Sequence, residues 1–267
     1  MRTTNRNITP SINILDININ VTNLDHSVQL ILQWIEKKKQ QYVCVRDVHG
    51  IVLSQKDSFL RSIHHNSGLT VPDGMPLVWI GRLLGFSSMG RVYGPELMNY
   101  LCRVSVEKGF THCLYGGKTN QQVQAVKFQL EKKFKGIKIS GAFCPPFSSF
   151  SEFNDFQLLS HLRSNQTDIL WVGVGTPKQE YIMSHLVKHT NTNVIIGVGA
   201  AFDIITNIQS DAPDWVKKLG LQWFFRSLQD PGRLGKRYIK IIPSFIILMF
   251  IRWIKKKKFN QKKGKQS

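Results

Sequence analysis

The sequence is short of acidic residues and of closely spaced cysteines, and each shortage excludes a class of protein. Only 17 of its 267 residues are Asp or Glu, against 36 Lys or Arg. The net charge of +19 calls for an anionic partner such as a membrane, a nucleic acid or a phosphorylated substrate. No CxxC pair occurs. We therefore expect Cys44, Cys102, Cys113 and Cys144 to be reduced thiols of a cytosolic protein, buried where they sit in apolar runs.

Several nucleotide-binding and metal-binding motifs are also absent. GVGTPK and GVGAAF lack the third glycine of the dinucleotide-binding fingerprint, and no P-loop occurs, so neither an NAD enzyme nor a P-loop NTPase is expected. No HExxH, GxSxG or paired-cysteine motif occurs, and the only DxD-like run, SDAPD at 210–214, is interrupted. His64 and His65 are expected at the surface rather than on a metal. Residues 1–16 lack an apolar core, so no signal peptide is expected.

Positive charge is concentrated at the C-terminus. Residues 231–267 contain 12 Lys or Arg and no acid. Residues 241–254 (IIPSFIILMFIRWI) are apolar but shorter than the roughly 20 residues that span a bilayer, and four lysines follow at 255–258. The pattern favours a helix in the membrane interface, with a disordered polybasic tail over 255–267 held by anionic lipid. The alternative is an ordinary core helix with a solvated tail.

Between the ends, short apolar runs alternate with amphipathic stretches. After a polar leader, the patterns predict helices at 24–38, 95–107, 120–134, 151–163 and 177–189, and strands at 42–45, 111–115, 137–140, 168–172 and 193–196. Strands that alternate with helices of this length predict an α/β fold with a parallel sheet flanked by helices. We expect a catalytic domain over 1–220 and a basic helical C-terminal appendage over 221–254.

Four apolar runs end in turn-forming segments: LTVPDG (69–74), CLYGG (113–117), WVGVG (171–175) and IIGVGAAFD (195–203). In an open parallel sheet the ligand lies outside the carboxyl ends of the strands, where these loops converge. Gly116 and Gly117 precede one predicted helix. Gly175 precedes another, in which Thr176 is expected as the N-cap residue. Free amides at such helix starts suit a phosphate, whereas the alternative is that the glycines only make tight turns.

Seven segments occur in an order that resembles one family. They are VPDGMPLVW (71–79), RVYGPELM (91–98), LYGG (114–117), WVGVGTPKQE (171–180), GVGAAFD (197–203), APDWVKKLGLQWFFR (212–226) and DPGRLGKRY (230–238). Together they resemble the bacterial WecG/TagA/CpsF glycosyltransferases, over about residues 12–240. The resemblance implies a Rossmann-like core and an inverting, metal-independent transferase with no cofactor. It also implies transfer of a sugar from a nucleotide donor, usually UDP-linked, to a polyprenyl-diphosphate-linked acceptor in exopolysaccharide, capsule or teichoic-acid-type synthesis.

The resemblance further implies roles for individual residues. Asp73 matches the general base proposed for the family, although a plain turn aspartate is the alternative. The residues expected to bind the nucleotide and its diphosphate are Gly116, Gly117, Gly175, Lys178, Gln179, Asp203, Arg226, Arg233, Lys236 and Arg237. The spacing of Arg226, Arg233 and Arg237 predicts one shared helix face, and these cations would replace a metal as the appendage closes over the diphosphate. A solvated basic face is the alternative.

One stretch departs from the family pattern. Many members have a VTxN-like sequence after the first long helix, where this chain has VRDVHG at 45–50. The roles of that Thr and Asn therefore do not transfer. Arg46, Asp47 and His49 become candidates for donor or acceptor recognition, together with Arg91, although an internal Arg–Asp ion pair is the alternative. The donor sugar stays open among N-acetylmannosamine, its uronate and glucose.

The expected location is cytoplasmic, peripheral on the inner face of the cell membrane, and a homo-oligomer is compatible with the sequence. Two other classes of function were considered against this expectation. In a nucleic-acid-binding protein, cationic side chains would lie along one face of the folded domain with aromatic side chains between them. Here the cations instead follow an apolar helix, so no nucleic acid is expected. A non-catalytic scaffold would not need Asp73 or the basic appendage.

Overall fold

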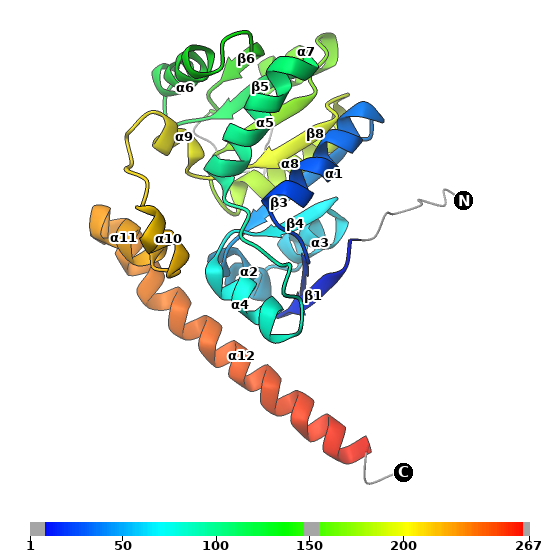
Figure 1. Ribbon diagram of the computed structural model, residues 1–267, viewed down its shortest axis with the longest axis vertical. Helices are drawn as coiled ribbons and strands as arrows, with labels where there is room; N and C mark the ends of the chain where they lie inside the picture. Colours follow the sequence, from blue (N-terminus) through cyan, green and yellow to red (C-terminus); the bar gives the residue numbers. More distant parts are fainter. Residues whose placement is uncertain (1–8, 147–154, 264–267) are drawn as a thin grey trace.

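A six-stranded parallel sheet forms the centre of the protein (Figure 1). The computed structural model describes residues 9–146 and 155–263, with side chains of the last helix described as far as Lys255. The strand order is β4-β3-β8-β7-β5-β6. The strands are β3 (Gln41–Arg46), β4 (Leu69–Pro72), β5 (Thr111–Gly116), β6 (Lys138–Phe143), β7 (Ile169–Gly173) and β8 (Val194–Gly197). The predicted α/β class is confirmed.

Helices cover both faces of the sheet. The helices before the appendage are α1 (Leu24–Glu36), α2 (Val48–Lys56), α3 (Ser58–Asn66), α4 (Met75–Leu83), α5 (Gly94–Lys108), α6 (Asn120–Lys133), α7 (Phe156–Ser164), α8 (Lys178–His189) and α9 (Ala201–Ile205). Helices α1, α5 and α6 pack on one face, and α3, α7 and α8 pack on the other. Of the helix predicted at 151–163, residues 151–154 lie outside the described part of the chain.

The central strands are apolar on both sides because both sides are covered. In β3, Val43 and Val45 pack with α1 and α5, whereas Tyr42 and Cys44 pack with α3 and α8. Side chains alternate between the two faces of a strand, so burial of both faces requires an unbroken apolar run. The free cysteines Cys44, Cys102 and Cys113 are buried as expected, and Cys144 is half-buried.

The segment expected to be a polar leader instead forms a β-hairpin. Strands β1 (Ser11–Ile14) and β2 (Ile17–Asn20) pair antiparallel. Four isoleucines alternate with polar residues along the pair, and all are at most 4% exposed: Ile12, Ile14, Ile17 and Ile19. Alternation of period two indicates a half-buried strand, so the leader interpretation missed a signal that the sequence contained. The hairpin packs with α2 and α4 in a third apolar cluster.

The C-terminal segment from Asp214 to Lys263, called the appendage from here on, starts before the predicted boundary at 221 and consists of three helices and one wide turn. These are α10 (Asp214–Lys218), α11 (Gln222–Gln229), the π-helical turn η2 (Pro231–Gly235) and α12 (Lys236–Lys263). Helix α12 is the long orange-to-red helix that extends away from the sheet in Figure 1. It continues to Lys263, through most of the segment predicted to be a disordered tail. Residues 264–267 lie outside the described part of the chain.

Helix α12 is apolar on two sides. On one side, Phe245 is buried in the hairpin cluster, and Leu248 and Met249 pack against the same cluster. Farther along, the Arg252 guanidinium donates to the Asp16 carboxylate at 2.7 Å. On the other side, apolar side chains such as Phe250 stay 58% exposed. One side of the helix thus packs as a core helix does, and the other side is exposed.

Candidate active site

A cavity of about 650 Å³ lies at the carboxyl edge of the sheet. The loops after β3, β4, β5, β7 and β8 each contribute to its wall, through Asp47, Asp73, Gly117, Gly175 and Gly199 respectively. Parallel strands end at the same edge, so their following loops meet there. The predicted convergence of the strand-end loops is confirmed, and the loop after β3 joins the four expected ones.

The glycines predicted to approach a phosphate divide into two kinds. Gly117 and Gly175 line the cavity, and each has a φ of +82°, in the left-handed region that favours glycine. Gly116 is absent from the cavity wall. A Cβ atom there would lie 2.7 Å from the carbonyl oxygen of Gly173. Gly116 therefore allows two strands to approach closely rather than facing a ligand.

The start of α8 differs from the predicted capping arrangement. Pro177 occupies the N-cap position, and no side chain caps the helix. The Thr176 hydroxyl instead donates to Glu180 Oε1 at 3.2 Å and accepts from Arg46 Nη2 at 2.9 Å. Lys178 and Gln179, both predicted to bind the nucleotide, line the cavity.

Gln179 joins two of the strand-end loops. Its Oε1 accepts from the Gly199 amide at 3.0 Å, and its Nε2 donates to Glu180 Oε1 at 2.9 Å. The side chain is buried. Gln179 therefore holds the loop after β8 against the start of α8, and so shapes the cavity wall.

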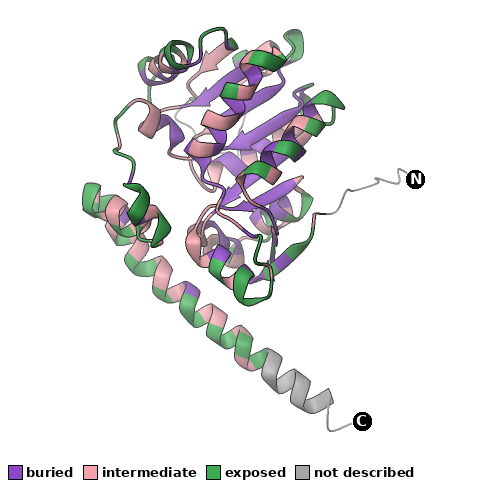
Figure 2. Cartoon of the chain, in the orientation of Figure 1, coloured by how far each residue is buried: buried purple, intermediate pink, exposed green. Residues whose placement is uncertain are grey.

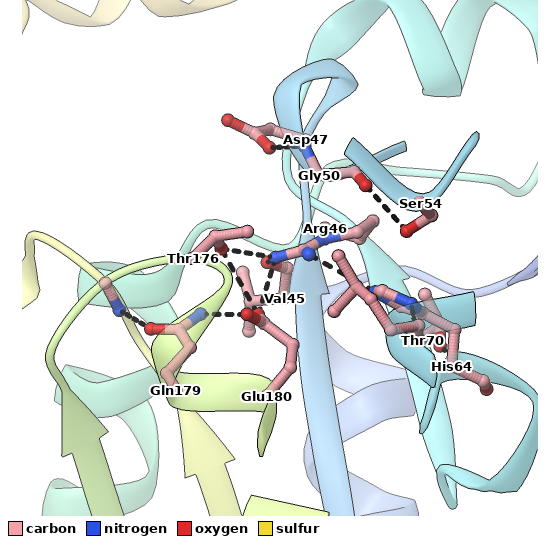
Figure 3. Close-up of polar contacts among 12 residues, drawn as sticks. Val45, Arg46, Asp47, Gly50, Ser54, His64, Thr70, Thr176, Gln179 and Glu180 are labelled. Carbon is pink, nitrogen blue, oxygen red and sulfur yellow. Dashed lines mark hydrogen bonds and ion pairs between the residues drawn. The ribbon is translucent and has the colours of Figure 1, made fainter. Parts of the chain in front are cut away.

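Arg46 is an internal residue (Figure 3). Its Nη2 lies 2.8 Å from Glu180 Oε1, and the two side chains are 1% and 0% exposed. The carboxylate of Asp47, the ion-pair partner considered from the sequence, is turned away from Arg46 in Figure 3. The structure thus gives Arg46 an internal ion pair, but with a residue 134 positions away. That pair ties β3 to α8, and Arg46 also forms part of the cavity wall.

His64 was predicted to lie at the surface, and this was wrong. Its side chain is buried, with Nε2 facing Arg46 Nη1 at 3.2 Å and Nδ1 facing the Leu60 carbonyl at 2.7 Å. A carbonyl only accepts, so Nδ1 donates and Nε2 accepts from Arg46. Burial and the Arg46 charge lower the pKa of His64 to about 3, which keeps the ring neutral.

Asp73 follows β4 at the rim of the cavity. Its backbone amide donates to the Arg46 carbonyl at 2.8 Å. Its Oδ1 is buried and has no hydrogen-bond partner among the described residues. Burial raises the pKa of Asp73 to about 7, although the nearby cations Arg91 and Arg226 oppose the rise. The next helix has no side-chain cap, so Asp73 does not serve as a capping aspartate. A carboxyl group with a pKa near neutrality suits a general base.

Asp47 and His49 lie at the start of α2 and also face the cavity. Asp47 accepts from the Gly50 amide at 3.0 Å. Burial alone would raise the pKa of Asp47, but the charges of Arg46 and His49 outweigh it and the pKa is lowered. Burial lowers the pKa of His49. The site therefore contains an ionised Asp47 beside an Asp73 whose pKa is raised. Two neighbouring carboxyl groups with different pKa values often have different roles in catalysis.

A second cavity of about 280 Å³ adjoins the first. The two share Asp47, His49, Asp73 and Arg226. The second cavity lies between the starts of α2 and α4 on one side and α11 and α12 on the other, and its walls are mostly apolar. Asp73 therefore lies where a polar cavity and an apolar cavity meet.

Arg91, a predicted recognition residue, lines only the smaller cavity. Its guanidinium donates to Glu96 Oε1 at 3.0 Å and to Gln222 Oε1 at 3.1 Å. It also lies 4.6 Å from the centre of the Tyr93 ring. The contact with Gln222 connects Arg91 to the appendage, and the charge of Arg91 acts on Asp73.

The three appendage arginines line the large cavity, but they belong to three different elements and not to one helix as predicted. Arg226 belongs to α11, Arg233 to η2 and Arg237 to α12, yet all three line the cavity. The turn at Asp230 separates α11 from α12, so the prediction of one shared helix face was wrong although the convergence is real. Lys236 is exposed and lines neither cavity.

Asp203 is the last of the predicted nucleotide-binding residues. It lines the cavity at α9, where its Oδ1 accepts from Gln122 Nε2 at 2.7 Å.

Among the described residues, no group of three or more His, Cys, Asp and Glu side chains is arranged to hold a metal ion. Within the same part of the chain, no helix has the length and apolar character needed to cross a membrane.

Comparison with known proteins shows which family and which relatives the chain is similar to. The family described as "Glycosyl transferase WecG/TagA/CpsF family" matches residues 12–259. A relative from Staphylococcus aureus (strain MW2) is 26% identical over 245 residues, covering 90% of this chain and 92% of the relative. A relative from Bacillus subtilis (strain 168) is 26% identical over 211 residues, 79% of each chain. Both are named N-acetylglucosaminyldiphosphoundecaprenol N-acetyl-beta-D-mannosaminyltransferase.

Proposed function

This chain belongs to the WecG/TagA/CpsF family of glycosyltransferases, and we propose that it transfers a sugar, with inversion, from a UDP-linked donor to a polyprenyl-diphosphate-linked acceptor. The observation that carries the proposal is the half-buried Asp73 side chain at the junction of a polar and an apolar cavity, whose Oδ1 is buried with no hydrogen-bond partner among the described residues. A nucleotide sugar suits the polar cavity. The names of the two relatives supply the class of acceptor.

Asp73 acts as the general base in this proposal. The carboxylate removes the proton from an acceptor hydroxyl as that oxygen attacks the anomeric carbon of the donor. Attack from the face opposite the departing nucleoside diphosphate inverts the configuration in a single displacement. A base with a pKa near 7 is half ionised at neutral pH and still takes the proton effectively.

The departing diphosphate is stabilised by cations and amides. Arg226, Arg233 and Arg237 line the same cavity as the glycine turns at Gly117 and Gly175. Guanidinium groups form paired, charge-assisted hydrogen bonds with phosphate oxygens and so suit the charge that develops on the leaving group. We propose that these groups make the reaction independent of a metal. A transfer assay in the presence of EDTA tests this proposal.

Asp47 and His49 are proposed to recognise the sugars. Both face the space shared by the two cavities, beside Asp73. An ionised carboxylate and a neutral imidazole can together accept and donate hydrogen bonds to sugar hydroxyl groups. Exchange of these residues should therefore change the preference among donor or acceptor sugars.

Membrane association is proposed to occur through α12. Its free side exposes apolar residues such as Ile239 and Phe250, and the lysines at 255–258 follow in sequence. Apolar insertion and attraction of lysines to anionic lipid together give stable peripheral binding. The enzyme would then work at the inner face of the cell membrane, and co-sedimentation with anionic liposomes tests this location.

A transfer assay tests the proposed function. The purified chain is incubated with a panel of UDP-sugars, beginning with UDP-N-acetylmannosamine, and with N-acetylglucosaminyl diphosphate attached to a prenyl chain. The expected result is one productive donor whose product has the opposite anomeric configuration, as determined by NMR. Retained configuration, or no transfer from any donor, would reject the proposal.

A further inference from the structure

The smaller cavity has a polar end beside Asp73. Arg91 and Arg226 are the cations of its wall nearest the base, and both act on the charge of Asp73. The Nε atom of Arg226 and the Nε2 atom of Gln222 are buried without hydrogen-bond partners among the described residues. Buried donors left unpaired are costly, so their presence points to an acceptor group that the ligand supplies.

The remainder of the smaller cavity is apolar. Its walls come from the start of α4 and from α11 and α12, and the apolar side chains are Met75, Pro76, Trp223, Ile241, Ile242, Phe245 and Ile246. At the outer end of this wall, Ile246 is 61% exposed, so the cavity opens along α12. A ligand that fills the whole cavity must therefore have an anionic or polar head and an apolar tail.

We infer that this cavity is the subsite for the part of the acceptor's prenyl chain that adjoins its diphosphate. The inference rests on the proposed function, because it takes a lipid-diphosphate acceptor as given. The acceptor sugar would lie at Asp73, the acceptor diphosphate near Arg91, and the first isoprene units between α4 and α12. Arg226, which lines both cavities, would lie between the acceptor diphosphate and the donor diphosphate.

The geometry favours a lipid-linked sugar over other occupants. The cavity is continuous with the donor cavity through the four residues shared around Asp73, so its occupant meets the donor sugar there. A volume of about 280 Å³ is too small for an entire long prenyl chain. Beyond Ile246 the chain would follow the exposed apolar side of α12, the same side that is proposed to enter the membrane.

Two adjacent isoleucines provide a matched test. Ile246 is 61% exposed and Ile247 is 57% exposed, but only Ile246 lines the cavity. The full chain and the variants Ile246→Asp and Ile247→Asp are assayed without membranes. Two water-soluble acceptors are compared, in which N-acetylglucosaminyl diphosphate carries either a chain of two isoprene units or an ethyl group.

The expected wild-type kcat/KM is at least about tenfold higher for the isoprenoid acceptor, because burial of several methylene groups contributes to binding. In Ile246→Asp this preference should fall at least about threefold, whereas Ile247→Asp should keep it. Ile242→Trp, which fills the cavity from within, should also reduce the preference. Far-UV circular dichroism and UDP binding check that each variant is folded.

The outcomes separate this inference from the proposed function. Equal use of the two acceptors by the wild type, or an equal loss of preference in Ile246→Asp and Ile247→Asp, would overturn the prenyl subsite while leaving glycosyl transfer intact. Occupation of the cavity by a second copy of the chain would appear as a dimer that Ile246→Asp dissociates, and would also overturn it. Absence of transfer to both acceptors with every donor would instead refute the proposed function.

Discussion

The sheet side and the appendage side of the active site are built in opposite ways. Loops on the sheet side are held by buried groups, of which the Arg46–Glu180 pair and Gln179 are the clearest. In contrast, α11 has no buried residue, and Figure 2 shows the appendage mostly exposed or half-buried. The proposed base therefore belongs to a preorganised wall, whereas the cations proposed to stabilise the leaving group belong to a loosely packed element.

Polar contacts connect the appendage to α5 and to the loop before it. Lys217 lies 4.0 Å from Glu96, and Arg91 donates to Gln222, whereas the pairs of Lys217 with Asp211 and Asp214 are local. Removing one partner of a partly exposed pair costs little, whereas removing one partner of a buried pair leaves an uncompensated buried charge and is strongly destabilising. Substitutions on the sheet side should therefore act through chemistry or global stability, and substitutions in the appendage through local closure.

Substitution of the proposed base should reduce activity most. Asp73→Asn should reduce turnover by about 10²–10⁴-fold, because the amide cannot accept the acceptor proton. UDP affinity should stay within about twofold of wild type, since the substitution preserves the shape of the loop. Steady-state kinetics and calorimetry measure the two quantities.

The pH profile provides the control for this variant. Only the carboxylate form of Asp73 serves as base, and its pKa is raised to about 7, so wild-type kcat/KM should fall as the pH drops below about 7. The residual rate of Asp73→Asn should lack this fall. Near-wild-type turnover of the variant would remove Asp73 from the mechanism.

Breaking the buried ion pair should have the next largest effect. Arg46→Met leaves the Glu180 carboxylate buried without its partner, which should lower the free energy of unfolding by about 3–5 kcal/mol. The double variant Arg46→Met with Glu180→Leu should recover most of this loss, because no unpaired charge remains. Urea titrations measure both. A loss below about 1 kcal/mol in the single variant would show that the sheet side is not held as described.

Substitutions of two neighbouring cations of the appendage test its contact with the diphosphate. Arg237 lines the large cavity and Lys236 does not. Arg237→Gln should weaken UDP binding by about 10–100-fold through loss of a charged hydrogen bond, and uridine binding by about twofold or less. Lys236→Gln should change either affinity by less than about threefold. Equal losses for UDP and uridine in Arg237→Gln would indicate general disruption instead of a diphosphate contact.

The smallest effect is expected at the ion pairs that hold the appendage. Lys217→Ala should cost about 1 kcal/mol or less, because these pairs are partly exposed. Hydrogen exchange should become faster in α11 and remain unchanged in α8. An equal increase in the hydrogen-exchange rates of α11 and α8 would contradict the conclusion that the sheet side is firmly held and the appendage side loosely held.

Local sequence signals predicted the sheet and the position of the site. Strand runs followed by glycines marked the loops that line the large cavity, and Gly117 and Gly175 have the backbone conformation for which glycine is suited. The alternating isoleucines of the hairpin were also a readable signal, but the polar residues between them suggested a leader.

Long-range pairings could not be predicted from local patterns. The partner of Arg46 lies 134 residues away, and only the packing of β3 beside α8 identifies it as Glu180. Likewise, helical spacing grouped the appendage cations correctly in space but could not exclude Lys236, because a turn at Asp230 redirects the chain. The apolar cavity was not foreseen, since its walls come from helices far apart in sequence.

A structure of the ternary complex with UDP and an acceptor analogue tests the central claim most directly. The quantity to measure is the distance from the Asp73 carboxylate to the reacting hydroxyl of the acceptor. This distance should be about 2.6–3.2 Å, with the diphosphate of UDP against the appendage arginines. An acceptor hydroxyl beyond hydrogen-bond reach of Asp73 and in contact with a different base would contradict it.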